Sequence, residues 1–146
     1  MYLLDTNVVS ESRKLATGRA DPNAVAWMSA TDPASTHISA ITLFEIEHGV
    51  LLMERRDRVQ GAMLRRWLVE TVQPAFEGRV LPMSAEVAIQ CARLHVPDPR
   101  SERDSWIAAT ALVYDMNVVT RNVDDFAGTG VSLINPWGAP DAPSRQ

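Results

Sequence analysis

The fold is decided by the first residues of the chain, Tyr2-Leu3-Leu4-Asp5, where three apolar side chains end abruptly at an acid. A short apolar run bounded by polar residues predicts a strand that is buried on both faces. Four later segments, at residues 36–39, 79–82, 117–120 and 131–134, are predicted as further short strands.

Helical patterns separate these strands. The clearest follows Ser39, where apolar residues from Ile41 to Met53 recur at helical spacing. The other predicted helices are a short one over residues 8–10 capped by Thr6 or Asn7, a brief one at 25–28 after a loop at 13–23, one from about 58 to 72 that stops before Pro74, one capped by Ser84, and one that starts near Glu102. Strands that alternate with helices predict an α/β fold with a central, mainly parallel sheet of about five strands, covered on both faces.

The length of 146 residues suits a single domain. A domain of this size buries roughly 68–70% of its unfolded surface, so it can hold a core without disulfides. The chain is 46% hydrophobic and 22% charged, which is typical of a globular protein and not of a disordered one. We expect one domain over residues 1–137 and a flexible tail over residues 138–146, where prolines recur.

Cysteine usage and the start of the chain favour the cytoplasm. The single cysteine, Cys91, cannot form an internal disulfide and lies in an apolar run, which predicts a buried, inert thiol. No signal peptide precedes the first strand, and the apolar runs are too short to span a bilayer, so we expect no membrane association. The net charge of -4 argues weakly against a protein that coats nucleic acid, but it leaves a nuclease with an acidic centre open.

Acidic residues stand where a parallel sheet gathers its ligands, at the carboxyl ends of its strands. Asp5 ends the first strand, and Asp124 and Asp125 follow the fourth. Glu45 interrupts an apolar helix face, and Asp104 lies in the first turn of its helix.

Each of these acids also has a purely local interpretation. Asp5 is a suitable helix cap, Asp104 an ordinary first-turn acid, and the Asp124-Asp125 pair a turn. Glu45 is harder to explain locally, because an unpaired buried carboxylate is costly. Carboxylates that converge repel one another unless a cation neutralises them, and a set of oxygen ligands selects hard cations such as Mg²⁺ or Mn²⁺.

Four stretches, in order along the chain, resemble a known family. They are Leu3-Leu4-Asp5-Thr6-Asn7-Val8-Val9-Ser10, then Ser39-Ala40-Ile41-Thr42 leading into Glu45-Ile46-Glu47-His48-Gly49-Val50, then Arg103-Asp104-Ser105-Trp106-Ile107-Ala108-Ala109, and Val119-Thr120-Arg121-Asn122-Val123-Asp124-Asp125-Phe126. Together they resemble the VapC-type PIN-domain toxins of bacterial toxin–antitoxin pairs, especially the FitB-like branch. The resemblance implies a PIN-domain-like α/β/α sandwich.

The resemblance also implies a set of metal-centre acids, namely Asp5, Glu45, Asp104 and Asp125. In such proteins the fourth acid either follows the Thr-Arg pair or precedes the Phe. The first of these positions is Asn122 here, so we expect Asp125 to fill the role, Asn122 to assist it, and Asp124 to be an exposed neighbour. Thr6 is expected to contact the water shell of the metal.

The implied activity is metal-dependent endonucleolytic cleavage of RNA, with Mg²⁺ or Mn²⁺ as the cofactor. Asp5 and Asp104 are expected as the principal ligands, Glu45 as the holder of a metal-bound water or as the base, and Asp125 as the residue that completes the site or helps to hold a second ion. Arg121 is expected to contact a phosphate, whereas Arg103 is equally suited to a surface ion pair. The implied partners are a cognate small antitoxin and a second copy of the chain, in a homodimer or a larger toxin–antitoxin assembly.

For several other features a structural role is at least as well supported as a functional one. The basic stretch from Arg55 to Arg66 is either a solvated helix face or an RNA contact. The four tryptophans are expected in the core or an interface, and no histidine is assigned a catalytic role. The apolar residues of the short early helices are expected in the core or in a groove for an amphipathic partner segment, namely Val8, Val9, Val25, Trp27 and Met28.

Three other functions fit the sequence less well. A response-regulator receiver uses a lysine near its last strand, but the only lysine here is Lys14. An aspartyl phosphatase has a second acid two residues after the first, where this chain has Asn7. A catalytically silent binding module would lack the acids, and all four are present.

Overall fold

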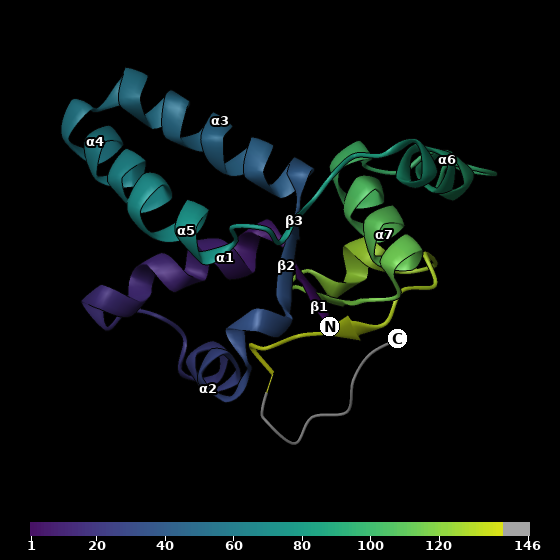
Figure 1. The fold of residues 1–146 in the computed structure, drawn as a ribbon, viewed down its shortest axis with the longest axis horizontal. Coiled ribbons are helices and arrows are strands. Elements are labelled where there is room, and N and C mark those ends of the chain that lie inside the picture. The colour runs from purple at the N-terminus through teal and green to yellow at the C-terminus, as the bar shows by residue number, and fades with distance from the viewer. Residues whose placement is uncertain (139–146) are drawn as a thin grey trace.

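The computed structural model describes residues 1–138, so most of the expected tail lies outside the described residues. Its centre is a sheet of five parallel strands in the order β3-β2-β1-β4-β5 (Figure 1). The strands are β1 (Tyr2–Leu4), β2 (Thr36–Ser39), β3 (Val80–Leu81), β4 (Asn117–Val119) and β5 (Leu133–Ile134). The predicted α/β class with a parallel five-stranded sheet is confirmed, and the chain's first strand lies at the centre of the sheet.

Helices cover both faces of this sheet. They are α1 (Thr6–Ser12), α2 (Pro22–Ala30), α3 (Ala40–Arg56), α4 (Arg58–Trp67), α5 (Gln73–Ala75), α6 (Ala85–Leu94) and α7 (Glu102–Tyr114), with 3-10 turns at Arg13–Thr17, Pro33–Ser35 and Val123–Phe126. In Figure 1, α1, α3, α4 and α5 lie on one side of the strands, and α6 and α7 lie on the other.

Adjacent residues of β1 join the two helical layers to the sheet. Successive side chains of a strand point to opposite faces. Leu4 accordingly packs with Val8 and Ile46 on the α1–α3 side, whereas Leu3 packs with Ile107 on the α7 side. Burial of each leucine contributes about 1.5–3 kcal/mol, so β1 anchors both halves of the core.

Local details of three predicted helices were wrong. The side chain that caps α1 is Asp5, as its local interpretation allowed, and not Thr6 or Asn7, because β1 ends one residue earlier than predicted and leaves Asp5 extended at φ -71° and ψ 159°. The predicted loop at 13–23 contains a 3-10 turn and the start of α2, which Asp21 caps. The helix expected to stop before Pro74 continues through a π-helical turn at Leu68–Val72, and Pro74 sits in the first turn of α5, where its missing N–H is tolerated.

Several expectations about buried residues are borne out. Cys91 is buried and unpaired, and burial raises the pKa of its thiol, as suits an inert side chain. Val8 and Val9 are enclosed in the core, whereas Val25, Trp27 and Met28 of α2 are half-buried, so a partner groove at α2 stays a prediction. The tryptophans are partly buried and pack against core clusters. Within residues 1–138, no helix combines the length and apolarity that a membrane span requires.

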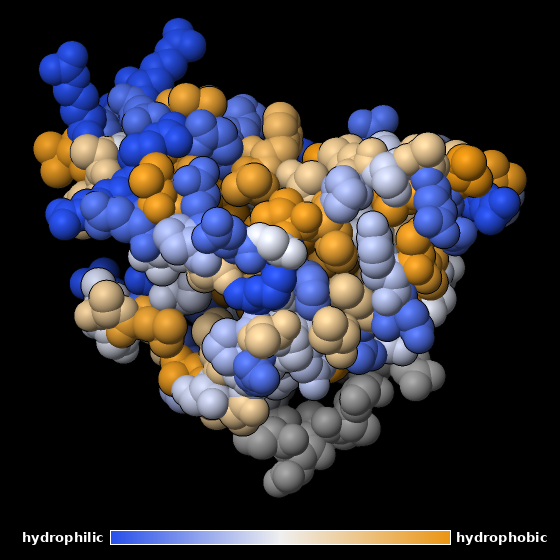
Figure 2. Space-filling view, in the orientation of Figure 1, coloured by the Kyte–Doolittle hydropathy of each residue, from blue (hydrophilic) through white to orange (hydrophobic). Residues whose placement is uncertain are grey.

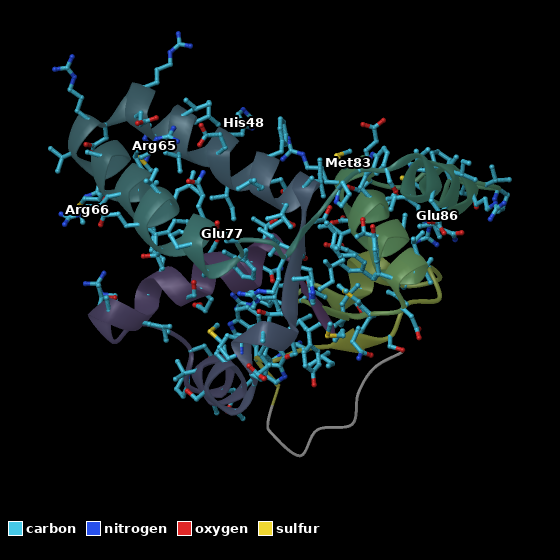
Figure 3. The ribbon with its side chains drawn as sticks, viewed as in Figure 1. His48, Arg65, Arg66, Glu77, Met83 and Glu86 are labelled. Atoms are coloured by element: carbon cyan, nitrogen blue, oxygen red, sulfur yellow. The ribbon has the colours of Figure 1, made fainter. Side chains whose placement is uncertain are left out.

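Helices α3 and α4 form a tightly packed hairpin that turns at Asp57, whose side chain caps α4. Gly61 of α4 is buried against α3, and a Cβ atom built on it would lie 2.4 Å from the Cα atom of Glu54. Arg65 spans the two helices and contacts Glu47 at 2.5 Å and Glu54 at 2.8 Å (Figure 3). Arg66 pairs with Glu70 on the surface. These pairs favour the solvated, mixed-charge interpretation for this part of the basic stretch.

Replacement of Gly61 by alanine should destabilise the protein by about 1–3 kcal/mol, the usual cost of overpacking, because α3 and α4 must move apart. Gly49 offers a matched control, since it is exposed in the middle of α3 and its added Cβ would have nothing within 4 Å. There alanine should stabilise by about 0.8–1.0 kcal/mol through helix propensity. Urea unfolding measures the free energy of unfolding of both variants. A Gly61→Ala variant as stable as the parent would contradict the close packing.

Candidate functional site

The site is built on the pairing of β1 with β4. Leu4 lies opposite Val119, so the residues that follow, Asp5 and Thr120, emerge side by side at the carboxyl edge of the sheet. Both are buried, and the Thr120 hydroxyl donates to Asp5 Oδ2 at 2.7 Å. The backbone N–H of Thr6 donates to Asp5 Oδ1 at 2.8 Å. Hydrogen bonds to both carboxylate oxygens therefore fix Asp5 at the junction between β1 and α1.

Asn7 joins α1 to the segment after β4. Its amide nitrogen lies 3.3 Å from Asp5 Oδ2 and 3.3 Å from the Thr120 hydroxyl, and its Oδ1 accepts from the backbone N–H of Arg121 at 3.2 Å. The backbone N–H of Asn122 donates to the Thr120 hydroxyl at 3.0 Å. Asn7 and Thr120 were not predicted as site residues from the sequence, although each is a polar residue just beyond the end of a central strand.

Glu45 reaches the same edge from α3. This helix starts directly after β2, with Ser39 as its cap, and Glu45 lies half-buried in its second turn. Its Oε1 accepts from the Thr6 hydroxyl at 3.1 Å, and its Oε2 lies 3.5 Å from Arg103 Nη1. The prediction of Arg103 as an ion-pairing residue is thus supported, with a site acid as its partner.

The surroundings of Glu45 differ from the expected apolar face. Phe44 is 52% exposed, because the core side of α3 is formed by Thr42, Ile46 and Val50. The exposed phenyl ring of Phe44 instead lies under the guanidinium of Arg103, whose Cζ atom is 5.3 Å from the centre of the ring. The same ring stacks with the imidazole of His48. Glu45 therefore stands at the boundary between the core side and the exposed side of the helix.

Asp104 approaches from the other face of the sheet, in the first turn of α7. Burial raises its pKa above the ordinary value, and the charges of Asp5 and Asp125 raise it further. Burial likewise raises the pKa of Asp5, with additional repulsion from Glu45 and Asp125, although the hydrogen bonds from Thr120 and Thr6 oppose the shift. Each of the four predicted acids thus interacts electrostatically with at least one other.

Asp125 is exposed on the 3-10 turn at Val123–Phe126, which starts after Asn122. It is the member of the Asp124-Asp125 pair whose charge raises the pKa of both Asp5 and Asp104. This agrees with the choice of Asp125 over its neighbour. Its role as the fourth acid stays a prediction.

The chemistry of this donor set fits a hard cation. Its side chains present carboxylate oxygens, and two of the carboxyl groups have raised pKa values that a positive charge would lower again. Within residues 1–138, no three acid, histidine or cysteine side chains already stand in the arrangement of metal ligands. Full convergence of the four acids on one ion therefore stays a prediction.

The expected substrate contacts lie around this edge. Thr6 is half-buried and bonded to Glu45, whereas Asn122 and Arg121 are exposed. The guanidinium of Arg121 lies 5.6 Å from the centre of the Trp137 ring. The role of Arg121 as a phosphate contact stays a prediction.

The raised pKa of Asp104 predicts how stability depends on pH without metal. The folded protein holds the proton of Asp104 to a higher pH than the unfolded chain, so the free energy of unfolding falls as the pH rises through this interval. Asp104→Asn removes this penalty and should raise the melting temperature at pH 7 in a chelating buffer.

Glu102→Gln is the matched control for this substitution. Glu102 is an exposed acid in the same first turn of α7, so its replacement loses the same favourable interaction with the helix dipole without relieving the crowding of acids. We expect no stabilisation from it. Thermal unfolding from pH 4 to 8 compares the variants, and a destabilised Asp104→Asn protein would contradict the crowding.

Known proteins resemble this chain along almost its whole length. A sequence model of the PIN domain matches residues 2–131, a range that contains all four acids. The chain is 34% identical to the VapC ribonuclease Y4jK of Sinorhizobium fredii, over 94% of this chain and 98% of that protein. It is also 34% identical to Toxin FitB of Neisseria gonorrhoeae, over 94% of this chain and 99% of that protein.

Solved structures show the same similarity in three dimensions. The crystal structure of FitAcB from Neisseria gonorrhoeae superposes with a TM-score of 0.85 at 31% identity, over 95% of this chain and 100% of that chain. FitAB bound to an IR36 DNA fragment superposes with a TM-score of 0.84 at 31% identity, over 95% of this chain and 97% of that chain. The family match ends at residue 131, so the domain boundary at residue 137 stays a prediction.

Proposed function

This chain belongs to the PIN domain family, and on that basis we propose that it is a metal-dependent endoribonuclease that acts as the toxin of a toxin–antitoxin pair. The observation that carries the proposal is the gathering of Asp5, Asp104 and Asp125 at the carboxyl edge of a parallel sheet, close enough for the charge of Asp125 to raise the pKa of the other two. Crowded acids of this kind cost stability, which is expected where they serve to bind a cation. The ribonuclease activity of the relative from Sinorhizobium fredii supports the same reaction.

Asp5 and Asp104 would hold a Mg²⁺ or Mn²⁺ ion, with Asp125 completing its charge balance and Glu45 beside it. Such an ion lowers the pKa of a bound water and neutralises charge on a phosphoryl oxygen. Thr120 and Asn7 orient the carboxylate of Asp5 through hydrogen bonds, so its ligand atoms are set before any ion arrives. Outer contacts of this kind are a usual requirement of metal sites.

Glu45 would serve as the base that accepts the proton of the attacking water, or would hold a metal-bound water. Its Oε1 is held by the Thr6 hydroxyl, which leaves the carboxylate oriented toward the edge of the sheet. Arg103 lies 3.5 Å from Oε2, so a positive charge stands beside the proposed base. Arg121 and Asn122 would bind the RNA backbone, Arg121 through its charge and Asn122 through its amide.

The comparisons favour a nuclease over the other candidates considered from the sequence. Lys14, the lysine that a receiver domain would need at its acidic pocket, pairs with Glu11 at 3.0 Å at the end of α1. Neither a receiver nor an aspartyl phosphatase accounts for a PIN-domain match over residues 2–131. A silent member of the same family is the remaining alternative, and the cleavage assay distinguishes it.

Purified protein should cleave single-stranded RNA in Mg²⁺ or Mn²⁺ and stop when the ion is chelated. Asp125→Asn should slow cleavage at least 10-fold because it removes a charge from the crowded cluster, whereas Asp124→Asn, an exposed neighbour in the same turn, should cleave at the parent rate. Gel analysis of a labelled RNA measures both rates. Equal losses in the two variants would refute Asp125 as the fourth acid, and no cleavage by the parent would leave the silent-module alternative.

The proposed partners are a cognate small antitoxin and a second copy of this chain. Several homologous structures are complexes, including FitAcB and a toxin–antitoxin complex from Klebsiella pneumoniae that superposes at 26% identity with a TM-score of 0.62. Figure 2 shows hydrophobic surface on the face where α3 begins near β3. The exposed apolar residues of this region include Phe44, Val80 and Met83, which suit an isologous two-fold contact.

Expression of the chain alone should arrest bacterial growth, because an unrestrained ribonuclease destroys cellular RNA. Co-expression with the small open reading frame beside its gene should restore growth by supplying the antitoxin. Colony counts after induction measure both effects, with Asp104→Asn as the inactive control. Normal growth on expression of a protein that cleaves RNA in vitro would reject the toxin role and leave the nuclease assignment standing.

A further inference from the structure

A cleft opens beside the acids, between α1, α3 and α4, which lie together on one side of the sheet (Figure 1). Its volume is about 220 Å³. Buried Ile46 and Val50 of α3 line it, together with the partly buried Trp67 of α4. Exposed Ser10 and Arg13, from α1 and the turn after it, contribute polar groups.

This cleft is continuous with the candidate active site. Thr6 and Glu45 line it, and the same two residues are hydrogen-bonded to each other at 3.1 Å next to Asp5. A polymer whose phosphate lies at the acids must place the group attached to a neighbouring sugar within a few ångströms of that phosphate. The cleft is the concave surface available there on the α3 side.

We propose that this cleft receives one unpaired nucleobase of the RNA, next to the phosphate that is cleaved. The proposal rests on the ribonuclease function proposed above and names the part of the substrate that the site recognises. RNA-binding proteins usually read single strands by stacking an exposed base on an aromatic or guanidinium plane and by hydrogen-bonding its edge. The lining contains residue types suited to both contacts, since Trp67 has aromatic surface and Ser10 and Arg13 have hydrogen-bonding groups.

The size and charge of the cleft argue against other groups. Its 220 Å³ is below the roughly 300–1,000 Å³ of pockets for drug-sized ligands, so it suits one ring system and not a dinucleotide. A phosphate would meet one arginine, one carboxylate and two buried aliphatic side chains, which is a poor anion site. An apolar side chain of a protein partner would leave Ser10 and Arg13 without a role.

The test combines a filled cleft with RNA that lacks one base. Gly49 lines the cleft, and a Cβ added there would have nothing within 4 Å, so Gly49→Leu should fill the space without a clash. Fluorescence anisotropy in Mg²⁺, with the inactive Asp104→Asn substitution in every protein compared, measures binding of a short single-stranded RNA and of a series with one abasic position each. For the parent protein, one abasic position should weaken binding roughly 5- to 100-fold, the usual contribution of a stacked base.

In Gly49→Leu the intact RNA should bind about as weakly as that abasic RNA binds the parent, and the abasic position should no longer matter. Gln60→Leu, an exposed position of α4 outside the cleft, is the matched control and should behave as the parent. Trp67→Leu gives a second variant, in case Gly49→Leu does not fold by circular dichroism. It keeps a side chain in the wall but removes the stacking surface, and it should lose the same abasic effect.

The outcomes separate this proposal from the assigned function. Cleavage by the parent with binding that is insensitive to every abasic position, or equally sensitive in the filled variant, would overturn the base site and leave the nuclease intact. Unchanged RNA binding in both variants, with weakened binding of the antitoxin, would assign the cleft to the protein partner instead. Absence of both RNA binding and cleavage in the parent would reject the ribonuclease function itself.

Discussion

The buried carboxylate of Asp5 is the constraint on which the rest of the site depends. It occupies the point where β1 ends, α1 begins and β4 passes alongside, and it accepts hydrogen bonds from Thr6 and Thr120. A carboxylate in that position is costly, since burial raises its pKa despite those two donors. A serine or asparagine would cap α1 equally well without the charge. Helix capping alone therefore does not account for an acid here, whereas a need for a negative charge at the edge of the sheet does.

The two helical layers supply the remaining charges from opposite faces of the sheet. Glu45 comes from α3, which packs on the side of Leu4, and Asp104 comes from α7, which packs on the side of Leu3. The acids can approach one another only because both helices begin at the carboxyl edge of the sheet. In each case the packing of apolar residues further along the helix fixes the position of the acid near its start. The free energy of the core thus offsets the repulsion at the edge.

The sequence was sufficient for the architecture, because the signals for a parallel sheet are local. Short apolar segments such as residues 2–4 and 117–119 are readable one at a time, and alternation with helices implies parallel pairing. The order of the strands and the details of helix ends depend on longer-range packing. The predicted helix end before Pro74 was therefore wrong, because the chain stays helical through Ala75 and Pro74 lies in the first turn of α5.

The site was only partly predictable for the same reason. Acids are visible in a sequence because a charge in an apolar segment is unusual, as at Asp5 and Glu45. The neutral or cationic residues that orient these acids are not visible in a sequence in the same way. Thr120 follows a strand as many threonines do, and its hydroxyl becomes informative only when the β1–β4 register brings it to Asp5. Phe44 misled in the opposite direction, since helical periodicity alone does not show which of two neighbouring apolar residues faces the core.

Arg103 shows how the unliganded site balances its charges. Its guanidinium lies 3.5 Å from Glu45 and also over the ring of Phe44, at the rim and not at the centre of the acids. One cation at the rim does not neutralise the cluster, because burial and neighbouring acids still raise the pKa values of Asp5 and Asp104. It lies instead beside Glu45, the acid proposed as the base. The structure thus distinguishes one carboxylate with a neighbouring arginine from the two buried or crowded acids, Asp5 and Asp104, whose raised pKa values a bound cation would lower.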